Sequence, residues 1–322
     1  MNTAADSGIA PPQLIHQALL YDSDQEFVAL TTGFCLDGLA VGDKVLAVTT
    51  ETNIALLAGS LGAAAAEVEF VAARSWYEVP GRTLAAYNRY VDTHKRFHDR
   101  VRIIGEPVWS DRSPAAEAEW TRYESVINAA FADSPAWIVC PYDERVLPER
   151  ITADARRTHP ALLTDSGTLR SPDYTDPAAF TGAADAHLLP AAPAGIVMES
   201  HFDGRLHLMR RRVSAQASEL GLTGAEINRL VLVVNEIATN AVQHGGGHGR
   251  IQLWADENTI VCDVTDPGRM DVAHPGYLPP DPATGHGQGL WIVRQLCELL
   301  EFRNHEHGTQ VRLHLARTHQ ES

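Results

Sequence analysis

The chain has 322 residues and a mass of 35.1 kDa, about twice the usual size of a single domain, so its length predicts two domains. It carries 26 basic and 41 acidic residues, and the resulting formal charge of −15 excludes a general binder of the nucleic-acid backbone. Residues 1–199 hold 15 of the basic and 27 of the acidic residues, so most of the excess negative charge belongs to the N-terminal half.

The four cysteines lie far apart in sequence and form no CxxC pair, which argues against a disulfide framework or a zinc ribbon and favours a reducing compartment. The first residues contain neither the basic nor the apolar segment of a signal peptide. The longest apolar stretch, residues 54–66, is too short to span a bilayer. We therefore expect a cytoplasmic protein that makes no membrane contact.

Short apolar runs alternate with longer helical patterns from Leu14 to about Pro160, which is typical of a parallel sheet flanked by helices. The predicted strands are 18–21, 44–49, 68–71, 101–104 and 136–140. The predicted helices lie near 24–39, 53–61, 82–97 and 115–132. The first strand leads into YDSDQEF, from Tyr21, which has three acidic residues and neither Gly nor Lys. Because this loop would repel phosphate, we expect no nucleotide hydrolysis in this half.

Three segments of the N-terminal half, HQALLYDSDQEF from His16, IGEPVWS from Ile104 and CPYD from Cys140, resemble the MEDS sensory domain over residues 12–160. The resemblance implies a RecA-like α/β fold that senses a small molecule. The candidate pocket residues fall at or near predicted strand ends: His16, Tyr21, Glu106, Trp109, Cys140 and Tyr142. A structural role is the alternative for each, and a metal or haem at His16 and Cys140 also stays open.

The Pro- and Ala-rich residues 161–199 are predicted to form a linker, and residues 200–317 a second domain. Helices are predicted at 205–220 and 223–243, with Thr223 and Glu226 as a capping box. The remaining elements are predicted as strands 250–255 and 260–265, helix 288–300, and strands 300–304 and 310–315. This order predicts an α+β sandwich.

The segment LVLVVNEIATNAVQHGGG, from Leu230, contains Glu236 and Asn240 four residues apart, so both lie on one face of the predicted helix. Asn240 could hold a hydrated Mg²⁺, and Glu236 could orient or deprotonate a nucleophile. Taken alone, the pair is a weak signal, because two solvated polar groups near a helix end would explain it better.

Two further motifs follow in order. Asp266-Pro267-Gly268 comes after a predicted strand, where the carboxylate could accept a hydrogen bond from an adenine amino group, although a lone DPG is usually a turn. GHGQGLWIV has glycines at alternate positions before a helix, which lets backbone N–H groups approach phosphates. These glycines are Gly285, Gly287 and Gly289, and Gly308-Thr309 precedes the last strand.

This ordered set resembles the GHKL ATPase superfamily, which has the Bergerat fold, and most closely its anti-sigma regulatory serine/threonine kinases. The resemblance implies that Asn240 binds Mg²⁺, Glu236 acts as the base on a substrate serine, and Asp266 contacts adenine with Thr309 nearby. It further implies a nucleotide pocket formed with Gly268 and the glycine-rich lid hinge.

The sequence thus predicts a signal-responsive serine/threonine kinase of the GHKL type, which binds ATP and Mg²⁺ under the control of a small-molecule sensor. It would phosphorylate an anti-sigma-factor antagonist, sequester a sigma factor, or do both, and a homodimer stays open. A sensor histidine kinase is one alternative; it needs a dimerising helical hairpin, for which the single helix after His201 and His207 leaves no room. A catalytically silent, ATP-dependent binding module is the other.

Overall fold

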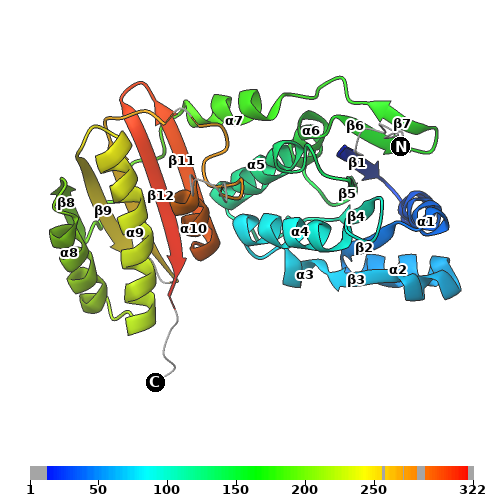
Figure 1. The fold of residues 1–322 in the computed structure, drawn as a ribbon, viewed down its shortest axis with the longest axis horizontal. Coiled ribbons are helices and arrows are strands. Elements are labelled where there is room, and N and C mark those ends of the chain that lie inside the picture. Colours follow the sequence, from blue (N-terminus) through cyan, green and yellow to red (C-terminus); the bar gives the residue numbers. More distant parts are fainter. Residues whose placement is uncertain (1–12, 256–257, 271, 281–286, 318–322) are drawn as a thin grey trace, which may run out of the picture. The chain divides into compact units, whose positions relative to one another are not determined.

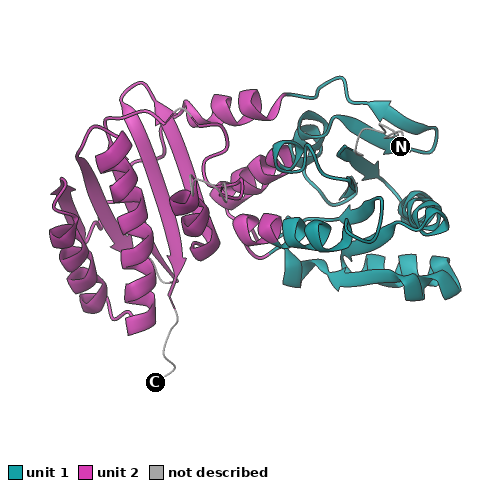
Figure 2. Ribbon diagram, viewed as in Figure 1, with its two compact units in different colours: residues 1–77, 86–110, 127–175 teal, residues 78–85, 111–126, 176–322 magenta. Residues whose placement is uncertain are grey.

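The computed structural model describes residues 13–255, 258–270, 272–280 and 287–317 (Figure 1). The chain divides into two compact units (Figure 2). Unit 1 comprises residues 1–77, 86–110 and 127–175, and unit 2 comprises residues 78–85, 111–126 and 176–322. No helix in the described part of the chain is long and apolar enough to cross a membrane.

Unit 1 is built on a seven-stranded sheet with the order β3-β2-β4-β5-β1-β6-β7. Its strands are β1 (Ile15–Tyr21), β2 (Lys44–Thr49), β3 (Val68–Ala72), β4 (Val101–Gly105), β5 (Ala136–Asp143), β6 (Ala161–Thr164) and β7 (Gly167–Arg170). All neighbours pair in parallel except β6 and β7, which form an antiparallel hairpin. The predicted α/β fold with a parallel sheet flanked by helices is confirmed.

The helices of unit 1 are α1 (Asp24–Val41), α2 (Glu51–Leu61), the 3-10 turn η1 (Gly62–Glu67), α3 (Ala73–Trp76) and α6 (Glu149–Thr158). Two helices, α4 (Pro80–His94) and α5 (Pro114–Ala130), begin in unit 2 and end in unit 1. Side chains alternate between the two faces of a strand. Leu19 and Tyr21 of β1 therefore lie on the face that packs on Phe27 and Phe34 of α1, and His16 lies on the opposite face.

The start of α1 is closed by the chain's own polar groups. Ser23 caps the helix and accepts a hydrogen bond from the Glu26 backbone N–H at 3.3 Å. The Glu26 carboxylate accepts one from the Asp22 N–H at 3.1 Å, and Arg145 pairs with Asp24 at 2.8 Å. The first helix of unit 1 therefore begins with capped and negatively charged groups, as the acidic YDSDQEF segment predicts.

Unit 2 contains a five-stranded antiparallel sheet with the order β11-β12-β10-β9-β8. Its strands are β8 (Met198–Phe202), β9 (Gly249–Ala255), β10 (Thr259–Asp266), β11 (Leu299–His305) and β12 (Gly308–Ala316). One core joins it to the helices α8 (Leu206–Glu219), α9 (Gly224–His244) and α10 (Gln288–Leu296). The predicted α+β sandwich is confirmed, and so is the capping box at Thr223 and Glu226.

Residues 161–199, predicted as a linker, contain more regular structure than their composition indicates. They form β6, β7, α7 (Pro177–Asp185) and the first two residues of β8. The hairpin turns at Gly167, whose φ of 106° suits glycine, and β6 pairs in parallel with β1. Asp176 caps α7 and Pro177 occupies its first turn. These local signals were hidden by the proline content, and the edge strand β8 was not predicted.

Candidate functional site

Glu236 and Asn240 lie one helical turn apart on α9, at the edge of its buried stripe. The stripe packs on the sheet through Val233, Ile237 and other apolar residues. Gly289, in the first turn of α10, lies directly against this pair. A Cβ atom added at Gly289 would be 2.9 Å from Glu236 Oε2 and 3.8 Å from Asn240 Nδ2. The backbone at the start of α10 thus lies so close to both polar groups that only a glycine fits at position 289.

Gly287 precedes α10 as its N-cap, with a φ of 84° and no side-chain capping hydrogen bond. This left-handed conformation favours glycine, and it leaves the backbone N–H groups of the first turn without a side-chain cap. An uncapped helix N-terminus attracts anions. The third glycine of the predicted loop, Gly285, lies outside the described residues.

Asp266 ends β10, and its Oδ1 atom accepts a hydrogen bond from the Gly268 backbone N–H at 2.9 Å. Three glycines pack closely around Asp266, and none of them has room for a side chain. A Cβ atom added at Gly245 would lie 2.2 Å from Asp266 Oδ1, and one added at Gly308 would lie 2.0 Å from the Asp266 carbonyl oxygen. A Cβ atom added at Gly268 would lie 2.2 Å from the Gly245 Cα. Burial raises the pKa of Asp266 to about 6, with the Gly268 N–H acting in the opposite direction. The carboxylate is therefore held in a half-buried site with backbone on several sides.

Thr309 is opposite Asp266 in the β10–β12 ladder, and its hydroxyl donates to the Gly268 carbonyl oxygen at 3.0 Å. These contacts fix Thr309 and Gly268 beside Asp266. All three residues line a pocket whose surface is mainly apolar. Its lining includes Ile237, Asn240, Ala241, His244, Gly245, Asp266, Gly268, Arg269, Met270, Leu290, Thr309 and Val311. Asn240, Asp266, Gly268 and Thr309, which were predicted from separate motifs, thus line one pocket. Gly289 and Glu236 lie next to Asn240 without lining the pocket.

Arg269 is an exposed cation in the pocket lining that the motif-based prediction missed. Because it directly follows Asp266-Pro267-Gly268, the sequence could have indicated its place near the pocket. Apolar walls with a few convergent polar groups are typical of a small-molecule site, and Arg269 adds a positive charge suited to phosphate.

The six predicted sensor residues separate onto the two faces of the unit 1 sheet. On one face, the buried Glu106 carboxylate accepts hydrogen bonds from Tyr21 Oη at 3.3 Å, Asn53 Nδ2 at 2.9 Å and the Thr49 hydroxyl. Burial, followed by the charge of Glu106, raises the pKa of the Tyr21 phenol. Tyr21 and Glu106 therefore belong to a closed polar cluster at strand ends.

On the other face, His16, Cys140, Tyr142 and Trp109 are buried together with His159, which the sequence did not indicate. His16 Nε2 is 3.5 Å from Cys140 Sγ, and the His16 and His159 ring centroids are 4.1 Å apart. Burial lowers the pKa of His159 to about 4, so its imidazole is neutral at pH 7. Ligand atoms of these His and Cys side chains lie within 4.8 Å of one another, a donor set that suits a transition metal.

An antiparallel sheet with helices on one face, and a glycine-lined pocket between α9, β10 and α10, defines the class of histidine kinase-like ATP-binding domains. The family described as Histidine kinase-like ATPase domain matches residues 201–315. The family described as MEDS, the MEthanogen/methylotroph, DcmR Sensory domain, matches residues 15–160. The chain therefore carries an N-terminal MEDS domain and a C-terminal histidine kinase-like ATPase domain, which confirms the resemblance to the MEDS domain and the resemblance to the GHKL ATPases.

Comparison with curated proteins gives no match. Among solved structures, the RsbU and RsbW domains of Rv1364c from Mycobacterium tuberculosis are similar at 17% identity and a TM-score of 0.29, over 38% of this chain and 34% of that one. The Acinetobacter baumannii histidine kinase AdeS is similar at 13% identity and a TM-score of 0.26, over 38% of this chain and 68% of that one. The chain thus spans about a third of the first of these structures.

Proposed function

We propose that the C-terminal domain binds ATP with Mg²⁺ and phosphorylates a serine of an anti-sigma-factor antagonist, sequesters a sigma factor, or does both, under control of the N-terminal domain. A histidine kinase-like ATPase domain implies ATP binding. The sensor domain of this proposal comprises residues 12–160, and its kinase domain comprises residues 200–317.

The contact of Gly289 with Glu236 and Asn240 is the observation that supports the proposal best. It brings the uncapped start of α10, a suitable place for phosphate, next to a carboxylate and a carboxamide. Asn240 would hold Mg²⁺ on the phosphates, and Glu236 would accept the proton of the attacking serine hydroxyl. Asp266 would accept a hydrogen bond from the adenine amino group, with Thr309 and Gly268 beside it.

Phosphoryl transfer depends mostly on positioning and on charge stabilisation by the metal, so loss of the metal ligand should abolish it. The test is transfer of labelled phosphate from ATP to a cognate antagonist by the full-length protein. Asn240→Ala should remove the transfer. The kinase part of the proposal fails if the wild-type protein binds ATP but labels none of the antagonists that it binds.

The histidine kinase alternative predicts label on one of the protein's own histidines. His201 lies in β8 and His207 in α8, and both are exposed. All residues from 186 to 223 are described, and α8 is the only helix among them, so this stretch holds no two-helix hairpin. This observation favours an external serine acceptor.

The remaining alternative is an ATP-dependent binding module without transfer. Glu236→Ala distinguishes it, because a binding module keeps its full regulatory effect after this substitution, while a kinase loses it. Nucleotide binding alone does not separate the two, since both need Asp266.

A further inference from the structure

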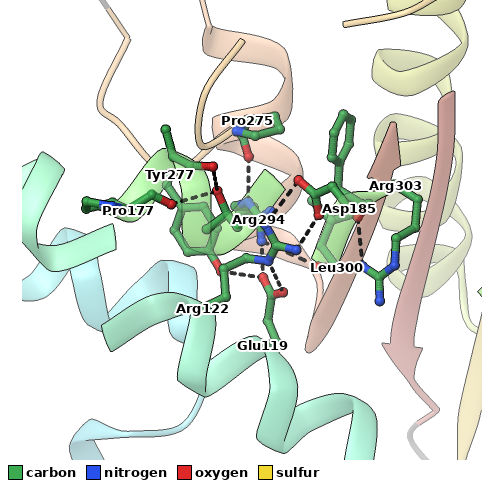
Figure 3. A network of polar contacts seen from close by, with 12 residues as sticks. Glu119, Arg122, Pro177, Asp185, Pro275, Tyr277, Arg294, Leu300 and Arg303 are labelled. Carbon is green, nitrogen blue, oxygen red and sulfur yellow. Dashed lines mark hydrogen bonds and ion pairs between the residues drawn. The ribbon is translucent and has the colours of Figure 1, made fainter. Parts of the chain in front are cut away.

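A buried polar network in unit 2 joins segments that are far apart in the sequence (Figure 3). Glu119 of α5 is 4% exposed, and one of its carboxylate oxygens accepts hydrogen bonds from the Arg294 guanidinium of α10 and from the Tyr277 hydroxyl. The Arg294 guanidinium also stacks on the Tyr277 ring, with Cζ 3.7 Å from the ring centroid. A single residue of α5 thus holds both α10 and the segment that contains Tyr277.

Carboxylates and guanidinium groups face one another in this network. Arg122, one turn after Glu119, lies 3.4 Å from its second carboxylate oxygen and donates to both oxygens of Asp185 at the end of α7. The buried Glu119 and Asp185 carboxylates thus face the buried Arg122 and Arg294 guanidinium groups, and the half-buried Arg303 lies near Asp185 as well (Figure 3). Removing the Glu119 charge therefore leaves buried arginines with less opposing charge. Such a network favours a single arrangement of α5, α7, α10 and the segment that contains Tyr277.

The second half of α10 is held by further contacts. Arg294 Nε donates to the Pro275 carbonyl oxygen at 2.8 Å. At the start of α4, Arg82 Nε donates to the Gln295 carbonyl oxygen at 2.8 Å, and Gln295 Nε2 donates to the Gly81 carbonyl oxygen at 2.9 Å. The end of α10 is thus fixed by residues 78–85 and 111–126, both of which fall inside the MEDS match.

The first half of the same helix lies at the candidate nucleotide site, where Gly289 contacts Glu236 and Leu290 lines the pocket. The segment 272–280 is attached to α10 as well: Gly276, at a φ of 72°, lies so close that an added Cβ would be 2.5 Å from the Leu290 carbonyl oxygen. Because α10 has only nine residues, a displacement at Arg294 is transmitted to Gly289.

We propose that Glu119 is a positioning residue for the nucleotide site: through Arg294 and Tyr277 it fixes α10 and residues 272–280, so that the MEDS-derived helix α5 sets the state of the site. This proposal rests on the proposed nucleotide function. The far end of α5 lies in unit 1, where Asn128 Oδ1 is 3.0 Å from His16 Nδ1 and Asn128 Nδ2 donates to the Thr158 carbonyl oxygen. One continuous helix therefore contacts the buried His16, Cys140 and His159 cluster at one end and the Arg294 network at the other.

The test compares Glu119→Gln with Asp263→Asn in the full-length protein. Asp263 is a matched control because it is also buried in unit 2 and pairs with Arg312 at 2.7 Å, but it touches neither α10 nor residues 272–280. Two quantities are measured for each variant: hydrogen exchange without nucleotide, and the affinity for Mg-ATP. Thermal unfolding checks that both variants fold.

Glu119→Gln is expected to speed exchange in residues 288–296 and 272–280 and to weaken Mg-ATP binding about tenfold. Asp263→Asn is expected to leave both within about twofold of the wild-type protein, even at an equal loss of Tm. Equal exchange in residues 288–296 for the two variants would overturn the proposal. A wild-type protein that fails to bind ATP would contradict the proposed function alone, since the exchange comparison needs no nucleotide.

Discussion

Two helix N-termini in this protein differ in their capping and in their charge. In unit 1, α1 begins with Ser23 as a side-chain cap and with the carboxylates of Asp24 and Glu26 in its first turn. In unit 2, α10 begins with Gly287 in a left-handed conformation, without a side-chain cap or an acidic residue in its first turn. The same partial positive charge is neutralised by side chains in α1 and has no such side-chain partner in α10, where the proposed function places the phosphates. The net charge of the chain therefore says little about where phosphate binds.

The largest expected effect is a loss of Mg-ATP binding when a residue next to the α10 N-terminus is changed. Asn240→Ala, beside α10, should weaken Mg-ATP binding by about a hundredfold and abolish transfer, because it removes the proposed metal ligand. Titration calorimetry with Mg-ATP measures the affinity. Asn235→Ala on the same helix is the control; its side chain accepts a hydrogen bond from Arg210 at 2.9 Å, and binding should not change. Equal losses in the two variants would contradict the assignment.

Glycine-to-alanine substitutions sharpen the comparison. In Gly289→Ala, the new methyl group would displace the Glu236 carboxylate, so transfer should fall about tenfold with little change in stability. In Gly33→Ala, at an exposed position of α1, the added Cβ meets no atom within 4 Å, and stability should rise by about 0.5–1 kcal/mol. Steady-state transfer and thermal unfolding measure the two effects. Unimpaired transfer in Gly289→Ala would argue against Glu236 as the base.

The pH dependence of nucleotide binding should show the titration of Asp266. Its pKa of about 6 means that the carboxylate gains a proton as the pH falls from 7 to 5, so the affinity for ATP should fall over that window. Asp266→Asn should lose this component, and the difference between the two titrations removes the contribution of the γ-phosphate. Identical pH profiles would contradict the assignment.

The same raised pKa acts on the stability of the free protein with the opposite sign. The folded state holds the Asp266 proton more tightly than the unfolded state, so this group favours folding at low pH and loses that advantage as the pH rises through about 6. Asp266→Asn should therefore stabilise the nucleotide-free protein at pH 7.5 by on the order of 1 kcal/mol, allowing for its partial exposure. Urea unfolding at pH 7.5, 5 and about 3.5 measures this change, which should be smaller at pH 5 and vanish only below the ordinary carboxyl pKa of 3.8.

The smallest expected effect concerns α1. Ser23→Ala removes a cap and should cost about 1 kcal/mol in urea unfolding. It should not create a second nucleotide site, because Asp24 and Glu26 remain. A binding stoichiometry for ATP above one per chain would show that the acidic loop does not exclude phosphate.

Local patterns predicted the parts of the molecule that depend on near neighbours. β2 was predicted to the residue, since its buried apolar run ends at capping Thr50. The pairing of Glu236 with Asn240 follows from helical spacing alone. The division of the sensor residues between two faces was also readable, because His16 and Tyr21 are five positions apart on one strand and must point in opposite directions.

Other features depend on contacts between distant segments, which single-sequence patterns do not contain. His159 comes next to Cys140 only because α6 returns the chain to the sheet. Glu119 and Arg294 are 175 residues apart in the sequence, and neither belongs to a recognisable motif. Edge strand β8 escaped prediction because its side chains alternate only between half-exposed and exposed positions until Phe202.

The sharing of α5 between the units bears on modularity. The MEDS match contains Glu119, yet this residue neutralises Arg294 inside the other family's domain. A gene fusion that exchanged residues 201–315 alone would bury an arginine without its carboxylate. Recombination between relatives should therefore keep Glu119 together with Arg294. The segment exchanged as a unit should then extend beyond residues 201–315, which the ATPase family matches.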